Sequence, residues 1–279
     1  MTVTYHDHRQ ALGFRPTARA LRGFFRAGRR SAIAFRGDFF FGVVTLAVQL
    51  AVAVTVWRTV FNGREQVSGA SISVTVTYAA LAACLQAVLM PWQFSSLPMR
   101  VRRGQIATDM TRPLSLLGQV SAQNAGVIIG RLPIGLAGIV VTALLGALTA
   151  PASPLAAVYF VISATLGAAI SLMASLAVSM ATFWTLEVGG PMMVYRMGAA
   201  FLSGALIPLW FMPTWMATAL AWLPFQAQVY TPLSIYLGRI HGSHVGAAVA
   251  VQAVWIVIMY TLLQLIWRRA QHKVVVQGG

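Results

Sequence analysis

The residues of this sequence that could do chemistry are few and lie far apart. A P-loop requires Gly-x-x-x-x-Gly-Lys-Ser/Thr, but the sole lysine, Lys273, is followed by valine, so the chain cannot bind ATP in that way. Ser203 lacks the preceding glycine of a Gly-x-Ser-Gly nucleophile turn, and no His-Glu-x-x-His sequence is present. His241 and His244 have no carboxylate or thiol near them in sequence to complete a metal site. We therefore expect no catalytic residue, no metal and no cofactor on this chain.

The acidic residues argue against a self-powered pump. Ion-coupled carriers usually hold ionisable groups at mid-membrane. The five carboxylates are Asp7, Asp38, Glu65, Asp109 and Glu187, and they fall outside the centres of the apolar runs. Energy for any transport must therefore come from a partner.

The composition indicates a membrane protein. Of the 279 residues, 58% are hydrophobic and only 9% are charged, whereas a soluble domain devotes roughly 25% to charged residues. The formal charge of +15 could suggest nucleic acid, but long apolar runs separate the basic residues. We therefore expect contacts with membrane lipid and no nucleic-acid partner.

The apolar runs are long enough to cross a membrane. A helical span needs about 20 mostly apolar residues to cross about 30 Å of hydrocarbon. Six candidate spans meet this requirement: 39–57, 74–99, 132–150, 155–186, 192–211 and 245–267. The polar-inside alternation of a membrane barrel is absent. The sequence therefore predicts an all-α polytopic membrane protein with six transmembrane helices in a domain spanning 37–267.

The basic residues predict the orientation of these spans. Cytoplasmic segments carry an excess of Lys and Arg, and 17 of the 20 basic residues fall in segments on one side of the predicted spans. Residues 1–36, 100–131 and 268–279 are therefore expected in the cytoplasm, with both termini inside. The near absence of lysine among these basic residues is typical of a GC-rich bacterial genome, so the expected location is a bacterial cytoplasmic membrane.

Two segments outside the spans have their own patterns. Before the first span, Leu21, Phe24 and Phe25 alternate with arginines, which predicts an amphipathic helix in the headgroup region; a basic tail that only fixes topology is the alternative. Residues 207–238 are apolar but interrupted by prolines, which favours outer re-entrant helices. The residues that define this outer region are Pro208, Trp210, Pro213, Trp215, Trp222 and Pro224. Simple anchoring of the tryptophans at the interface is the alternative.

Polar and small residues within the spans have two interpretations. Gln49, Tyr78, Gln86 and Ser203 are candidates for a substrate path, because a glutamine facing lipid would leave its amide unsatisfied. Hydrogen bonding between helices is the alternative. The small residues at four-residue spacing are Ser163, Gly167, Ser171, Ser175 and Ser179, together with the pair Gly126 and Gly130. These strips predict close packing of helices.

The segment 100–114 combines a bend with a short helix. Gly104 permits a tight bend after a basic cluster, and Ile106 and Met110 are four apart and share one helical face. Asp109 and Arg112 offer polar contacts beside that face, and Arg112-Pro113 disfavours continuation of the helix. An alternative is that the basic residues only fix topology and bind anionic headgroups.

This segment resembles a cytoplasmic motif of a known family. The run RRGQIATDMTRPL over 102–114 resembles the I-x-x-G-x-I-x-x-x-L-x-R-P-L segment of permease subunits in type-2, V-shaped ATP-binding-cassette exporters. Met110 stands where the pattern favours leucine. Further similar motifs, in the same order, are Arg36-Gly37-Asp38, Trp57, Trp184 with Glu187, FLSGALIP over 201–208, and Leu223-Pro224-Phe225.

The resemblance implies a transmembrane permease subunit that works with two separate ATP-binding subunits and a second permease. ATP and Mg²⁺ would then be bound by the partners. The residues implied to couple this chain to the ATPase are Arg102, Arg103, Gly104, Ile106, Asp109, Met110, Arg112 and Pro113. The path would run between the two permeases, for a small or amphipathic substrate such as a drug, antibiotic or lipid. A non-transporting scaffold and an ATP-independent channel are the alternatives.

Overall fold

The structure is a computed structural model that describes residues 14–34, 36–89, 96–112, 114–185 and 189–277. Its helices are α1 (Phe14–Ile33), α2 (Arg36–Phe61), α3 (Ile72–Leu89), α4 (Leu97–Arg102), α5 (Gln105–Met110), α6 (Leu116–Leu144), α7 (Pro154–Ser179), α8 (Thr182–Thr185), α9 (Gly189–Leu202), α10 (Thr214–Ala221), α11 (Tyr230–Tyr236) and α12 (Ser243–Gln277). Short 3-10 helices lie at η1 (Leu209–Phe211) and η2 (Gln226–Gln228), and strands β1 (Gln66–Val67) and β2 (Ala70–Ser71) pair as an antiparallel hairpin.

Five helices of the described chain are long and apolar enough to cross a membrane, which confirms an all-α polytopic membrane protein. They are α2, α3, α6, α7 together with α8, and α12, and they overlap five of the six predicted spans. The remaining candidate, 192–211, falls on α9, which has 14 residues and is therefore about 21 Å long. Pro91, which falls within the predicted span 74–99, lies outside the described residues.

The third predicted span was placed too late in the sequence. Residue 132 was the expected start, but α6 begins at Leu116 and continues through Arg131. The guanidinium Nε of Arg131 donates a hydrogen bond to the carbonyl oxygen of Ala87 in α3 at 3.1 Å. A charged residue can therefore lie within this helix, because a neighbouring helix supplies its acceptor.

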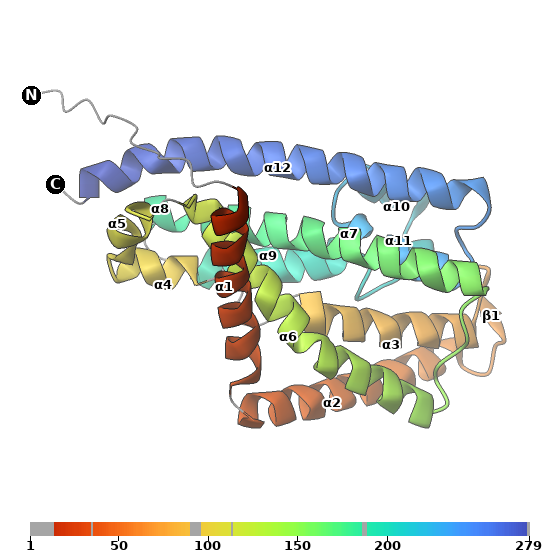
Figure 1. The fold of residues 1–279 in the computed structure, drawn as a ribbon. Helices are drawn as coiled ribbons and strands as arrows, with labels where there is room; N and C mark the ends of the chain where they lie inside the picture. The colour runs from red at the N-terminus through yellow and green to blue at the C-terminus, as the bar shows by residue number, and fades with distance from the viewer. Residues whose placement is uncertain (1–13, 35, 90–95, 113, 186–188, 278–279) are drawn as a thin grey trace, which may run out of the picture.

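The long helices lie side by side, and α3 is the most buried of them (Figure 1). One end of the bundle holds α4, α5 and α8 next to the last turns of α12, where Phe183 contacts Trp267 (Figure 1). The opposite end holds the hairpin between α2 and α3. The basic segment at α4–α5 and the β1–β2 hairpin thus mark the two ends of the molecule.

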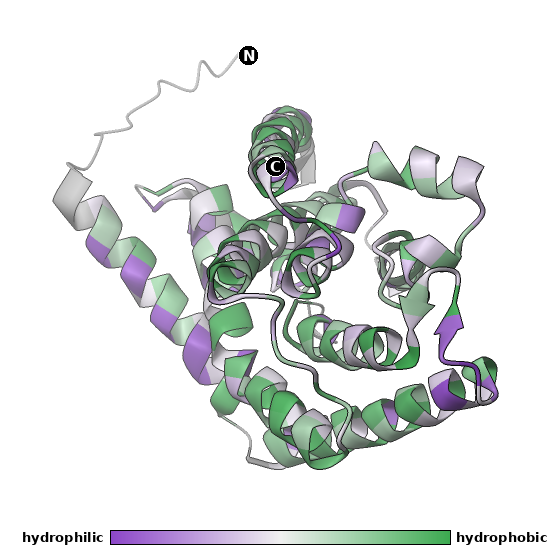
Figure 2. Cartoon of the chain, turned by 90° about the vertical axis from the view of Figure 1, so that its right-hand side faces the viewer, coloured by the Kyte–Doolittle hydropathy of each residue, from purple (hydrophilic) through white to green (hydrophobic). Residues whose placement is uncertain are grey.

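Helix α1 runs transverse to α12, α7, α3 and α2 and packs along α6 (Figure 1). The contact is between backbones: a Cβ atom on Gly28 would lie 1.9 Å from the carbonyl oxygen of Gln123, and one on Gly126 would lie 2.1 Å from that of Phe25. Gly126 and Gly130 therefore do permit close packing, as the spacing predicts. Hydrophilic residues form a stripe along α1, whereas the long helices are mostly hydrophobic (Figure 2).

The small-residue strip of α7 is buried along its length, which confirms the packing prediction. A Cβ atom on Gly167 would lie 2.8 Å from the carbonyl oxygen of Ala227 in η2. Gln252 of α12 joins these two elements, because its side-chain amide donates to the carbonyl oxygens of Ser163 at 3.0 Å and Ala227 at 2.7 Å. The connection between α9 and α12 therefore packs against the middle of α7.

Candidate coupling interface

The short helices α4 and α5 are joined by a bend at Gly104. This residue is the N-cap of α5 and has a φ of 67°, in the left-handed region. A Cβ atom added there would meet nothing within 4 Å, so the backbone conformation and not lack of space favours glycine. Pro98 lies in the first turn of α4, where its missing N–H costs no helical hydrogen bond.

An apolar anchor fixes α5 to the bundle. Ile106 is only 4% exposed and belongs to a buried cluster that includes Leu97 of α4, Leu117 of α6 and Met180 at the end of α7. Ile106 therefore packs against its own chain. The side chains of Met110 and Pro113 lie outside the described residues.

An ion pair connects the two short helices. Arg100 Nη1 of α4 lies 2.9 Å from Asp109 Oδ2 of α5, with side chains 14% and 10% exposed. Arg100 also donates to the side-chain oxygen of Gln123 in α6, which accepts a second hydrogen bond from the Ser96 hydroxyl at 3.1 Å. Asp109, which the sequence suggested as a polar contact beside the face of Ile106 and Met110, is buried and has Arg100 as its partner.

The end of α5 is also tied to the start of α6. The side-chain amide of Gln119 donates to the carbonyl oxygens of Asp109 at 3.2 Å and Leu114 at 3.1 Å. Ser115 caps α6 by accepting a hydrogen bond from the backbone N–H of Gly118 at 3.2 Å. The segment is therefore held on α6 both through Gln119 and through the ion-pair network at Gln123.

Sequence reasoning missed Arg100, Gln119 and Gln123. The sequence indicates Arg100 only as one residue of the basic cluster before Gly104. The two glutamines are four apart and share one face of α6, a usable signal, but the expected start of the third span at 132 placed them outside a helix.

The outward face of the segment is polar and basic. Its exposed residues are Arg102, Arg103, Gly104, Gln105, Thr108, Thr111 and Arg112. The guanidinium of Arg112 also lies over the ring of Phe24 in α1, 5.7 Å from the ring centroid. The segment thus combines an inner surface bound to α6 with an outer basic surface at one end of the bundle.

Comparison with known protein families identifies the chain. The model of the ABC-2 family transporter proteins matches residues 47–278. The chain belongs to the ABC-2 transporter family. It is a transmembrane permease of the ATP-binding-cassette (ABC) transporters, and this family assignment agrees with the resemblance of the α4–α5 segment. No match was found among curated proteins.

The four path candidates of this ABC-2 permease do not form one site. Tyr78 is fully buried, and its hydroxyl donates to the carbonyl oxygen of Gly204 at 2.9 Å. Ser203 is also fully buried, and its hydroxyl donates to the carbonyl oxygen of Ala200 at 3.3 Å. Gln49 lies on the exposed face of α2, whereas Gln86 is half-buried with no partner for its amide nitrogen among the described residues. The Tyr78 hydroxyl therefore joins α3 to the turn after α9, whereas the Ser203 hydroxyl bonds only to the end of α9.

The region of the permease between α9 and α12 is built around Trp210. Its ring lies 4.7 Å from that of Tyr78, and the guanidinium of Arg239 lies over it at 4.3 Å. Pro208 and Pro213 are the N-caps of η1 and α10, and Pro224 is buried. The sequence also singled out Trp215 and Trp222 in this region. Both are exposed, with exposed fractions of 73% and 79%.

The path of the chain through this region reverses. Phe211 stacks on Trp57 near the C-terminal end of α2, with ring centroids 5.0 Å apart. The chain then reaches η2, beside Gly167 in the middle of α7. It returns through α11, where the Tyr236 hydroxyl donates to the carbonyl oxygen of Thr149, in the connection before α7, at 2.9 Å.

Proposed function

We propose that this permease exports a small or amphipathic substrate, such as a drug, antibiotic or lipid, and is driven by two separate ATP-binding subunits. The observation that carries the proposal is the α4–α5 segment, which is fixed to α6 by Asp109, Gln119 and Gln123 while its basic face is exposed. A segment that transmits force must be rigid toward its own chain and accessible to its partner. The α4–α5 segment has both properties.

In the proposed topology the chain crosses a bacterial cytoplasmic membrane six times, with both termini inside. The fifth crossing consists of α9, about 21 Å long, and the turn that continues from it to Phe211. The stacking of Phe211 on Trp57 supports this, because Trp57 belongs to the last turns of α2. The basic α4–α5 end is cytoplasmic in this topology, as the positive-inside rule requires.

In the same topology α10, η2 and α11 form a re-entrant unit on the outer side. Gly167 lies about 20 Å along α7 from its first residue, Pro154, so η2 packs against α7 well below the outer surface. The hydrogen bond from Tyr236 to Thr149 then returns the chain to the outer end of α7. Non-helical backbone at this depth is tolerated because protein surrounds it.

The proposed path runs between this permease and a second permease subunit, along the exposed face of α2. That face is apolar at Val48, Val52 and Val56 and carries the amide of Gln49. A polar residue on such a face requires a partner or a cavity. Tyr78 and Ser203 are excluded from this path because both are buried within the chain.

Crosslinking tests the proposal. Thr108→Cys places a thiol on the exposed face of α5, and Arg64→Cys places one near the opposite end of the molecule as a matched control. When the permease is co-expressed with its ATP-binding subunit, Thr108→Cys should crosslink to that subunit and Arg64→Cys should not. An impermeant thiol reagent added outside intact cells should label Arg64→Cys alone.

The same complex distinguishes the alternatives. A permease couples the partner's ATP hydrolysis to substrate export. A scaffold would crosslink without stimulating hydrolysis, and a channel would pass substrate without ATP. Either result would contradict the proposed function.

A further inference from the structure

A cleft lies between the last turns of α1 and the neighbouring face of α6. It has a volume of about 580 Å³ and is lined from α1 by Arg29, Arg30 and Ile33, and from α6 by Ile129, Gly130 and Pro133. This volume falls in the range of roughly 300–1,000 Å³ that is typical of small-molecule sites. Helix α1 precedes residue 47, so this half of the cleft lies outside the residues that match the family model.

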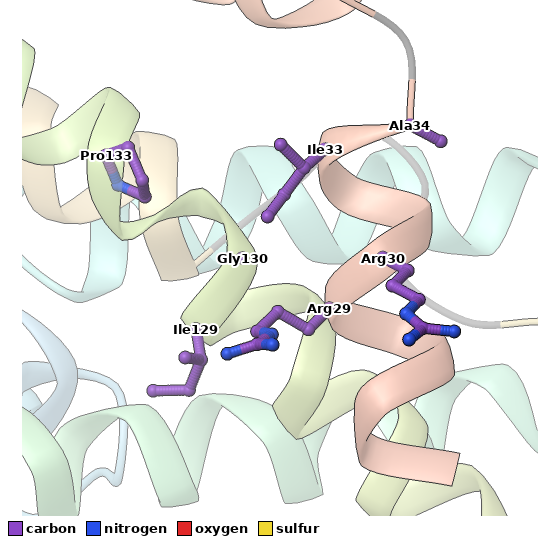
Figure 3. A pocket seen from close by; sticks show the side chains of 7 residues that line it. All are labelled: Arg29, Arg30, Ile33, Ala34, Ile129, Gly130 and Pro133. Atoms are coloured by element: carbon purple, nitrogen blue, oxygen red, sulfur yellow. The ribbon is translucent and has the colours of Figure 1, made fainter. Parts of the chain in front are cut away.

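The two sides of the cleft have different chemistry. Figure 3 shows that Arg29 reaches from α1 toward Ile129, while Arg30 points to the other side of α1. Ile33 and Ile129 are exposed apolar residues, at 50% and 43%. The helices meet at Gly130, where a Cβ atom would lie 2.9 Å from the carbonyl oxygen of Arg29, so backbone closes the cleft on one side. A positive group therefore stands beside an apolar surface, and the lining contains no acidic side chain.

We propose that this cleft binds an anionic membrane phospholipid. The guanidinium of Arg29 binds the lipid phosphate, because its planar donors match phosphate oxygens in a bidentate manner. The upper part of one acyl chain lies along Ile33 and Ile129 and removes their apolar surface from water. The proposal rests on the interfacial position of α1, whose amphipathic pattern and transverse orientation place it at the level of the headgroups (Figure 1).

The helix dipole of α1 does not explain the position of Arg29 beside the apolar surface of the cleft. A basic residue in the last turn stabilises a helix through its dipole, and Arg30 in the last turn of α1 meets that need. Arg29 is directed instead toward α6, beside two exposed isoleucines (Figure 3). A lipid with a phosphate next to an acyl chain complements both groups, and it would fix the end of α1 against α6.

Native mass spectrometry of the full chain in detergent micelles tests this site with phosphatidylglycerol and phosphatidylcholine as probes. The wild type should retain one phosphatidylglycerol in preference to phosphatidylcholine. Arg29→Gln should weaken retention about fivefold or more, which corresponds to about 1 kcal/mol for a basic residue at an anionic surface. Arg22→Gln is the matched control: it removes the same charge from an exposed residue of α1 that does not line the cleft, and it should retain the lipid.

A second variant tests the apolar part of the site without changing charge. Ile129→Trp fills the cleft at an exposed position and should also lose the lipid, so a result is available even if Arg29→Gln fails to fold. Equal retention of both lipids, equal weakening by Arg22→Gln and Arg29→Gln, unchanged binding in Ile129→Trp, or displacement of the lipid by excess inorganic phosphate would each overturn the proposal. The assay contains no ATP-binding subunit, so its failure leaves the proposed transport function intact.

Discussion

Removing the ion pair between Arg100 and Asp109 should loosen the α4–α5 segment while the rest of the bundle stays folded. The two groups lie 2.9 Å apart and are largely buried. A hydrogen bond to a charged group contributes roughly 1.5–3 kcal/mol, and a buried charge left without its partner costs more. Because both side chains retain slight exposure, we expect Asp109→Ala to lower the free energy of local opening by about 2–3 kcal/mol.

Hydrogen–deuterium exchange of peptides that cover α4 and α5 measures this opening. A loss of about 2–3 kcal/mol corresponds to roughly 30- to 150-fold faster exchange in this segment. Arg112→Ala is the control, because Arg112 lies 3.8 Å from the same carboxylate and is 50% exposed. An exposed pair contributes at most about 1 kcal/mol, so exchange should rise less than about sixfold. Equal effects of the two substitutions, or no change for Asp109→Ala, would refute the reasoning.

Three further substitutions test the packing and the proposed path. Gly28→Ala should detach α1 from α6, because its Cβ would meet the Gln123 carbonyl, whereas Gly23→Ala meets nothing within 4 Å; limited proteolysis should therefore release α1 only in the first variant. Gln252→Leu removes two hydrogen bonds between buried elements and should lower the unfolding free energy by about 1–2 kcal/mol in detergent titrations; no change would show that these bonds are not stabilising. Gln49→Trp should reduce export without shifting the unfolding midpoint, and normal export would remove α2 from the path.

The spans that the sequence predicts well are those with long charge-free runs. α2 and α7 follow such runs closely, whereas α12 begins near the start of its run but continues past the predicted end at 267 to Gln277. The start of α6 could not be placed, because Arg131 is accommodated by a carbonyl of α3, an acceptor far away in sequence. The run 192–211 is mostly apolar, with Arg196 as its one charged residue, but it is not helical throughout, since Gly204 adopts a left-handed conformation and Pro208 follows. Hydropathy alone therefore does not predict this turn.

In the candidate site, too, features that depend on local sequence could be predicted, whereas features that depend on contacts between distant residues could not. The bend at Gly104 follows from the backbone preference of glycine and could be expected from sequence. The burial of Asp109 could not, because Arg100 and the supporting Gln123 belong to two other helices. The amphipathic character of α1 was readable from its arginines and aromatic residues. Its backbone contact with α6 at Gly28 was not, because a single glycine in a helix has no periodic signal.

ATP hydrolysis by the reconstituted complex tests the central claim that the α4–α5 segment couples this permease to its ATP-binding subunits. Arg103→Glu reverses a charge on the exposed face of that segment, and Arg64→Glu reverses one in the connection between α2 and β1. We predict that Arg103→Glu abolishes substrate-stimulated hydrolysis and export while the permease remains folded, and that Arg64→Glu leaves both activities at the wild-type level. Full retention of substrate-stimulated hydrolysis and export by Arg103→Glu would contradict the claim.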